Sequence, residues 1–378
     1  MDALTTPSNW QRVRLENIAE IIGGGTPSTQ VTSFWNGSIN WFTPTEIGIT
    51  KYVHKSQRTI TPLGLKKSSA KLLPIGTILL TSRASIGDCA ILKEIATTNQ
   101  GFQSLIPLEK INNEFLYYLI LTLKNKLLEL ASGSTFLEVS PNKIKNLLIP
   151  LPPLNEQIAI ANILSDVDHY LYSLDALILK KESVKKALSF ELLSQRKRLK
   201  GFNQNWQRVR LGDITNYLTS NLSAEQITQQ GKIKVYDVNN FIGYTDITFI
   251  SDKPYISIVK DGSVGRVRIL PPKTNILSTM GALIANHKTT TEFLFYLLSN
   301  FDFKNFTSGS IIPHIYFKDY KEKTIFLPPL NEQIAIANIL SDLDSEIINL
   351  KNKKRQFDNI KKALNHDLMS AKIRVLKK

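Results

Sequence analysis

The sequence LPPLNEQIAIANILSD stands at residues 151–166 and again, unchanged, at residues 327–342. A shorter segment, NWQRVRL at residues 9–15, returns at residues 205–211, after the first long repeat and its basic extension. Because both repeats recur in the same order, the chain is an internal duplication of a variable domain followed by a nearly constant helix. A layout of this kind suits two recognition domains held at a fixed separation. The alternative is a duplicated scaffold with no recognition role.

Each constant segment opens a helix whose apolar residues recur at alternating spacings of four and three, as in the seam of a coiled coil. Proline pairs precede both helices, and Asn155 and Asn331 are predicted to cap them. A helix of about 40 residues is roughly 60 Å long. This length favours a spacer that sets the distance between the two domains over a helix packed only on its own domain. The seam residues are Ile160, Leu164, Val167, Leu171, Leu174, Ile178, Leu188 and Leu192, with Lys181 and Lys185 between them, and Ile336, Leu340, Leu343, Ile347, Leu350, Phe357, Leu364 and Leu368, with Lys354 and Lys361 between them.

Both long helices begin with acidic residues and end with basic ones, so antiparallel pairing sets acid against base at both ends. We therefore expect the two helices to pair antiparallel within one chain and to relate its halves by a pseudo-two-fold axis. A full overlap of the seams puts Ile160 level with Leu368. That register sets Lys361 between Asp166 and Asp168, and Lys185 between Asp342 and Asp344.

The composition is that of a globular protein with two or three packed domains, since 378 residues include 42% apolar and 9% aromatic residues. Neither a leader pattern nor an apolar run of membrane-spanning length is present, so we expect a cytoplasmic protein that has no membrane partner. The single cysteine, Cys89, is expected as a small buried residue of a strand rather than a nucleophile. Five histidines show no spacing typical of metal ligands: His54, His169, His287, His314 and His366.

The net charge of +15 resembles that of a nucleic-acid-binding protein, but its distribution is uneven. Residues 180–200 carry eight Lys and Arg against two acids, and residues 351–378 carry ten against two. The two helix ends thus hold nearly all the excess, where cations also favour a helix C-terminus for purely structural reasons. Both variable domains are close to neutral, so a DNA-binding surface on them must come from local clusters of residues.

The variable domains are predicted to be mixed α/β. Short β-branched runs separated by turn signals predict strands over residues 9–150, with one helix over 112–130 capped by Asn112 or Asn113. The second domain has a matching helix over 290–301, and its Ser263-Val264-Gly265 aligns with Ser85-Ile86-Gly87. The two domains are therefore expected to share a fold and to differ in surface.

Motifs for covalent chemistry are missing. The sequence has no Walker loop, no GxGxxG fingerprint, no GxSxG elbow, and neither of the tetrapeptides DPPY and NPPF of amino-methyltransferases. GGGT at 23–26 leaves a nucleotide site open as an alternative, but it lacks the following lysine. A tight turn that needs positive φ is the favoured interpretation.

Candidate DNA readers are polar or basic residues on loops. Arg can donate two hydrogen bonds to guanine, and Asn or Gln can pair with adenine in the major groove. Trp35 and Trp41 lie close by, and Trp41 is expected to be a core anchor rather than a stacking platform. For every candidate the alternative is a solvated surface residue. The candidates are Thr43, Thr45, Arg83, Ser85, Asn99 and Gln100 in the first domain, and Lys260, Ser263, Arg266, Thr279 and His314 in the second.

Over essentially its full length the chain resembles the specificity subunit of type I restriction-modification systems. The resemblance rests on GGTPS at 24–28, WFTPTEI at 41–47, TSRASIG at 81–87, TTNQGF at 97–102 and the two helices that begin with LPPLNEQ. It implies an α+β fold in which two similar mixed α/β target recognition domains are separated by two long antiparallel coiled-coil helices. The implied domains are residues 1–150 and 201–326, and the implied spacer helices lie within 151–200 and 327–378.

The resemblance also implies a function. Each domain would read one half of a bipartite site in double-stranded DNA, while the helices would set the spacer and dock methyltransferase subunits, two in all. The methyltransferase would modify adenine at N6 with S-adenosylmethionine and restriction subunits would use ATP, so this chain would bind no cofactor and be non-catalytic. The second domain is 20 residues shorter and lacks GGTPS and NQGF, which implies an asymmetric target. The alternatives are an enzyme in its own right and a coiled-coil interaction scaffold that binds no DNA.

Overall fold

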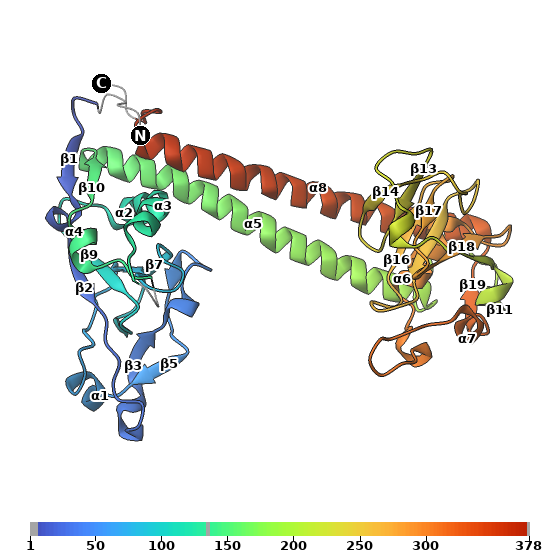
Figure 1. Ribbon diagram of the computed structural model, residues 1–378, viewed down its shortest axis with the longest axis horizontal. Helices are drawn as coiled ribbons and strands as arrows, with labels where there is room; N and C mark the ends of the chain where they lie inside the picture. Colours follow the sequence, from blue (N-terminus) through green and yellow to red (C-terminus); the bar gives the residue numbers. More distant parts are fainter. Residues whose placement is uncertain (1–6, 134–136, 376–378) are drawn as a thin grey trace. The chain divides into compact units, whose positions relative to one another are not determined.

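The computed structural model describes residues 7–133 and 137–375 (Figure 1). Residues 1–6 of the expected first domain and residues 376–378 of the expected second helix lie outside this part. The chain divides into two compact units, the first made of Met1–Leu174 and Lys353–Lys378 and the second of Asp175–Asn352. Each unit is described here on its own.

The domain of the first unit contains two main sheets and a two-stranded ribbon. The larger sheet has the strand order β2-β9-β6-β7-β4, and the smaller, β5-β3-β8, includes the parallel pair β3 and β8. Strands β1 and β10 form the ribbon that joins the start of the domain to its end (Figure 1). The strands are β1 Gln11–Arg14, β2 Ala19–Gly23, β3 Trp35–Phe42, β4 Tyr52–Val53, β5 Arg58–Ile60, β6 Ile78–Leu80, β7 Cys89–Leu92, β8 Ala96–Thr98, β9 Gln103–Pro107 and β10 Leu148–Leu151.

The domain of the second unit repeats this topology. Its larger sheet has the order β12-β18-β15-β16, its smaller sheet β14-β13-β17 again contains one parallel pair, and β11 pairs with β19. The added edge strand β4 of the first domain accounts for part of its greater length. The α+β fold with two similar mixed domains is thus confirmed. The strands are β11 Gln207–Arg210, β12 Thr215–Thr219, β13 Ile233–Tyr236, β14 Phe241–Thr245, β15 Tyr255–Val259, β16 Val267–Leu270, β17 Asn275–Ile276, β18 Met280–Ala285 and β19 Thr324–Leu327.

Each larger sheet is covered by an apolar helix. The first is α2, Asn113–Thr122, whose cap Asn112 accepts a hydrogen bond from the Phe115 backbone as expected. The single helix predicted over 112–130 is wrong, because α3, Lys124–Leu130, is a separate helix. The Thr122 hydroxyl donates to the Leu119 carbonyl, and the Leu123 N–H donates to the Ile120 carbonyl at 3.0 Å, a three-residue step that interrupts the α-helical hydrogen bonds. The second is α6, Thr291–Ser299, within the predicted 290–301.

The remaining helices of the domains are short: α1 Pro62–Lys66 and α4 Pro141–Lys145 in the first, and α7 Phe317–Tyr320 in the second.

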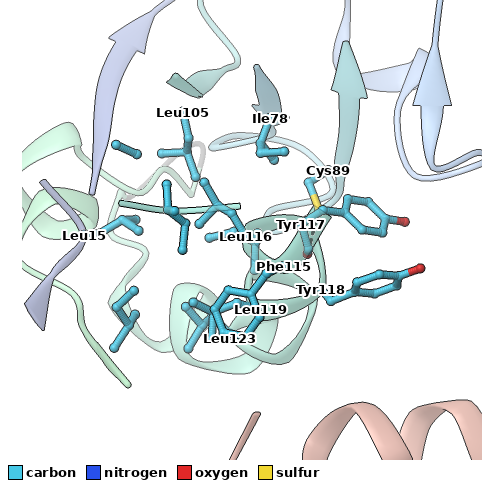
Figure 2. Packing of buried hydrophobic residues seen from close by; sticks show 14 of the residues in the cluster. Leu15, Ile78, Cys89, Leu105, Phe115, Leu116, Tyr117, Tyr118, Leu119 and Leu123 are labelled. Carbon is cyan, nitrogen blue, oxygen red and sulfur yellow. Dashed lines mark hydrogen bonds between the residues drawn. The ribbon is translucent and has the colours of Figure 1, made fainter. Parts of the chain in front are cut away.

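The main core of the first domain lies between α2 and the strands that it covers. Phe115, Leu116 and Leu119 of the helix meet Ile78 and Leu105 of the sheet (Figure 2). Cys89 joins this cluster, and burial raises the pKa of its thiol well above its usual range. The prediction of Cys89 as a small buried residue is confirmed.

The two constant segments form the long helices α5, Leu154–Leu193, and α8, Leu330–Met369. Both begin one residue before the predicted caps, so the prediction that Asn155 and Asn331 are caps is wrong. Each asparagine lies in the first turn and accepts from the next backbone N–H, at 3.0 and 2.9 Å. The proline carbonyl ahead of each helix, Pro153 in the first, accepts the first intrahelical bonds instead. Among the described residues no helix is long and apolar enough to cross a membrane.

Contacts within each unit show that the long helices pair antiparallel. In the first unit the start of α5 lies beside the end of α8, where Lys361 forms an ion pair with Asp168. In the second unit the end of α5 lies beside the start of α8, where Lys185 forms an ion pair with Asp344. Both lysine pairings expected from the fully overlapped register are confirmed. The seam leucines Leu164, Leu340 and Leu368 are buried.

A buried carboxylate ties each domain to its helices. Glu156, 2% exposed at the start of α5, accepts from Trp10 Nε1 at 3.1 Å and from Arg374 Nε at 2.8 Å. Trp10 belongs to the start of the first domain and Arg374 to the segment after α8. The arrangement therefore fastens three distant parts of the sequence within the first unit. The second unit repeats it with Glu332, Trp206 at 3.0 Å and Arg198 at 2.6 Å.

Candidate nucleic-acid interface

Four loops of the first domain converge on one edge, and together they carry all six residues predicted as readers there. The loops are 24–26, 43–46, 82–87 and 98–101, and we call them the first loop surface. Backbone hydrogen bonds join them: Asn99 N to Phe42 O at 3.0 Å, Gly25 N to Thr98 O at 2.8 Å, and Ser82 N to Gly101 O at 2.8 Å. The structure thus brings together residues that lie more than fifty positions apart in the sequence.

Of the three glycines at 23–25, Gly24 and Gly25 serve close packing rather than an unusual backbone angle. Glycines with positive φ occur elsewhere in the described part of the chain, but none of these three adopts it, so that prediction is wrong. A Cβ on Gly24 would lie 1.9 Å from the Asn99 carbonyl oxygen, and one on Gly25 would lie 2.3 Å from a backbone nitrogen. Trp41 is buried and donates to the Gly25 carbonyl at 2.9 Å, which confirms it as a core anchor.

The two threonines of the first loop surface have different roles. Thr43 donates to Glu46 Oε2 from both its backbone N–H and its hydroxyl, each at 2.7 Å, and so fixes the 3-10 turn Pro44–Glu46. Thr45 is exposed, with its hydroxyl 3.0 Å from that of Thr43. Thr43 therefore shapes the loop, whereas Thr45 presents a polar group to solvent.

Arg83 and Gln100 are held in place by neighbours that the sequence did not reveal. The Arg83 guanidinium, 42% exposed, lies 2.9 Å from a carboxylate oxygen of Glu138 on a fifth loop. The Gln100 side-chain carbonyl accepts from the hydroxyl of Thr26. An arginine fixed on one side by a carboxylate keeps other N–H groups for a ligand. Ser85 is exposed at the tip of its turn, with φ +58°.

Part of the second domain's predicted set also meets at one place. Lys260 N donates to the Thr279 carbonyl at 3.1 Å, and Ile315 N donates to the Lys260 carbonyl at 2.9 Å. His314 Nδ1 lies 2.6 Å from Asp261 Oδ1, which holds the loop 308–314 on the turn 260–266. These two loops and Thr279 form the second loop surface.

Ser263 and Arg266 also belong to the turn 260–266 of the second loop surface. Ser263 is exposed at the tip of the turn, while Arg266 donates to Asn239 Oδ1 at 3.0 Å on another loop. Arg268, which sequence reasoning missed, donates to the carbonyl of the same asparagine at 2.9 Å and lies over the Tyr236 ring. The available signal was the spacing: Arg268 of β16 lies two positions after the candidate Arg266, which directly precedes that strand, and alternate residues of an extended segment share a face.

The two loop surfaces occupy equivalent places in the fold. The turn after β6 corresponds to the turn after β15, and each is held by a later loop through an acid–base pair, Arg83 with Glu138 or His314 with Asp261. Such surfaces offer hydrogen-bond donors and acceptors on a rigid support, which suits recognition of base edges. Within residues 7–133 and 137–375 no cluster of His, Cys, Asp and Glu has the makings of a metal site.

A family model described as the type I restriction modification DNA specificity domain matches residues 7–181 and 203–357. The chain belongs to this family. Each match spans one domain and most of the long helix that follows it, so the two halves of this specificity subunit are two copies of the family's domain.

Several relatives resemble the specificity subunit over nearly their whole length. The type I restriction enzyme MjaIX specificity subunit of Methanocaldococcus jannaschii is 29% identical over 98% of this chain and 94% of the relative. The crystal structure of the type I restriction-modification S subunit from M. genitalium has a TM-score of 0.61 at 20% identity, covering 97% of both chains. The HsdS subunit from Thermoanaerobacter tengcongensis has a TM-score of 0.56 at 18% identity, covering 98% of this chain and 99% of that one. At these identities the two structures establish the shared fold.

Proposed function

We propose that this specificity subunit is a non-catalytic reader of double-stranded DNA in which each domain reads one half of a split target. The convergence of polar loops at one edge of each domain carries the proposal. The first loop surface offers Arg83 and Gln100, and the second offers Lys260 and His314 with Asp261 beside it. Because the donors and acceptors differ, the two halves should be different sequences and the target asymmetric.

The long helices would set the spacer and dock methyltransferase subunits. Each helix has 40 residues, or about 60 Å at 1.5 Å per residue. The repeated segment exposes the same two apolar side chains in both copies, one turn apart, and exposed apolar residues at repeated positions are typical of protein interfaces. They are Leu154 (45% exposed) and Ile158 (41%), and Leu330 (45%) and Ile334 (47%).

Two equal docking sites support two methyltransferase subunits, with restriction subunits joining through the assembled complex. Changing Ile158→Asp should reduce the bound methyltransferase from two copies to one, and Ile334→Asp should do the same, because a carboxylate at an apolar contact would have to be desolvated. Mass photometry of the assembled complex measures this directly. Retention of two copies in both variants would contradict the docking assignment.

The cofactors would belong to the partners. We assign transfer of a methyl group from S-adenosylmethionine to adenine N6 to the methyltransferase subunits and ATP use to the restriction subunits. The specificity subunit would contribute position and sequence choice, and Arg83, Gln100, Lys260 and His314 would act by hydrogen bonding alone.

The experiment that tests this function compares the purified subunit with its complex. Alone, the subunit should transfer no methyl group to DNA and should bind a specific site weakly, since its nearly neutral domains neutralise few phosphates. With its methyltransferase it should direct methylation to a split site. Methyl transfer by the subunit alone would contradict the assignment, and a complex that assembles but binds no DNA would favour an interaction scaffold.

A further inference from the structure

In the first unit a tyrosine hydroxyl of the domain meets both long helices at one carboxylate. Tyr118 of α2 lies at the edge of the core, with its hydroxyl directed away from the apolar cluster (Figure 2). The hydroxyl donates to Asp168 Oδ2 of α5 at 2.5 Å, and Lys361 of α8 pairs with the same carboxylate. Three elements from distant parts of the sequence thus share a single buried charge.

The second unit contains the same joint built from its own residues. The Tyr296 hydroxyl donates to Asp344 Oδ2 at 2.9 Å, and Lys185 pairs with that carboxylate. Tyr118 and Tyr296 are each the sixth residue of their domain helix. The two domains differ in most of their sequence. A tyrosine at the same position in both therefore indicates that each domain needs it there.

A second contact holds each domain helix at its start. Gln157 Oε1 of α5 accepts from the backbone of Asn112 at 2.9 Å, and Gln333 Oε1 of α8 accepts from that of Thr290 at 3.1 Å. Tyr118 lies six positions after Asn112, which is about 9 Å along the helix axis. A single contact would allow the domain helix to rotate about that point. Two contacts at this separation fix its direction relative to the long helix.

In the first unit the carboxylate of this joint depends on its partners because it is buried, whereas the Asp344 side chain in the second unit is 31% exposed. Asp168 is largely removed from water, and in the first unit the buried Lys51 adds hydrogen bonds to the Tyr118 hydroxyl at 2.9 Å and to Ser165 at 2.7 Å. Burial, and then the bond to Asp168, raises the pKa of Tyr118 well above its usual range, so its hydroxyl remains a donor even at a pH where an exposed tyrosine ionises. A buried charge that loses a partner is costly, which favours one arrangement of the domain over its neighbours.

We propose that Asp168 with Lys361, and Asp344 with Lys185, are positioning residues for DNA reading: each pair holds the hydroxyl of one domain tyrosine, Tyr118 or Tyr296, and thereby sets the angle at which that domain presents its loop surface. The inference rests on the proposed reading of one half-site by each domain. Residues that touch no DNA are thereby expected to affect how selectively one half-site is recognised, and to leave recognition of the other half-site unchanged.

The test measures half-site discrimination in the complete complex, as the ratio of methylation rates on the intact site and on sites with one base changed. Tyr118→Phe removes only the hydroxyl, and it should lower discrimination at the half read by the first domain by about tenfold, the factor that one charge-assisted hydrogen bond supplies. The other half should be unchanged. Tyr296→Phe is the mirror variant and should lower discrimination at the opposite half alone.

Matched variants separate positioning from stability. Lys361→Arg should retain discrimination and Lys361→Met should lose it, while Lys362→Met on the exposed face of α8 should have no effect. Ile60→Val, in a separate core cluster of the first domain, lowers thermal stability away from the joint and should leave discrimination intact.

Three results would overturn the inference while leaving the proposed function in place: unchanged discrimination in both tyrosine variants, an equal loss at both halves in either one, or a loss in Ile60→Val as large as in Tyr118→Phe. If the unaltered complex recognises no split site, the proposed function fails and this inference fails with it.

Discussion

Arg374→Ala should strongly destabilise the first unit because it leaves the Glu156 carboxylate buried without its cation. Glu156 is 2% exposed, and it accepts from Arg374 at 2.8 and 3.2 Å and from Trp10 at 3.1 Å. Breaking a buried ion pair from one side costs about 3–5 kcal/mol. The Arg374 side chain is 29% exposed, so water can partly replace it. We therefore expect a loss of about 3 kcal/mol, at the lower end of that range.

The assay is unfolding in guanidinium chloride followed by tryptophan fluorescence and far-ultraviolet circular dichroism, analysed with separate transitions for the two units. The double variant Arg374→Ala with Glu156→Gln should recover more than half of the loss, because a neutral amide replaces the unpaired charge. Arg198→Ala should cause a similar loss in the second unit, where Glu332 is fully buried. Arg12→Ala, an exposed change on β1, is the control. A loss in Arg374→Ala no larger than in Arg12→Ala would refute the reasoning.

Three further predictions concern the loop surfaces and the core. Arg83→Ala and Gln100→Ala should each weaken or relax recognition of one half-site by about 1–3 kcal/mol, measured as binding of the complex to duplexes with single base changes; full affinity and an unchanged motif would remove both from the readers. Gly24→Ala should cost at least about 2 kcal/mol in thermal unfolding, whereas Gly23→Ala, whose Cβ would lie 3.6 Å from its nearest neighbour, should cost less than about 1 kcal/mol, and equal losses would contradict the packing argument. Burial raises the pKa of Tyr320 above its ordinary 10.0, so the contribution of its neutral hydroxyl to stability is complete below that pH and is lost as the pH rises further. The urea midpoint of unfolding should therefore fall above about pH 10. An equal fall in the Tyr320→Phe variant would count against this.

The duplication, the strand content and the helix register were accessible from the sequence because each leaves a periodic pattern. Repeated segments align the halves, and a seam spaced by four and three residues fixes which faces of two helices meet. In that register Lys361 and Lys185 each lie opposite acidic residues of the other helix. The ion pairs with Asp168 and Asp344 agree with this placement.

Other features leave no periodic signal and required the structure. Nothing in the sequence connects Arg83 to Glu138, or Lys51 to Tyr118, because these pairs depend on how loops and helices meet across the fold. Gly24 and Gly25 were misread because a close approach and a positive φ both select glycine, and sequence alone does not separate the two causes. The loops that carry the candidate readers were identified, but which of their side chains support the loop and which face solvent became clear only from the hydrogen bonds.

The central claim is that the two domains read separate halves of one site. The direct measurement is to exchange residues 212–320 for those of a related specificity subunit, express each version with the methyltransferase, and map the methylated adenines in the DNA. The account predicts a split motif in which one half changes and the other half and the spacer stay the same. A folded and active exchange variant that altered both halves, or a methylated motif that was not split, would contradict it.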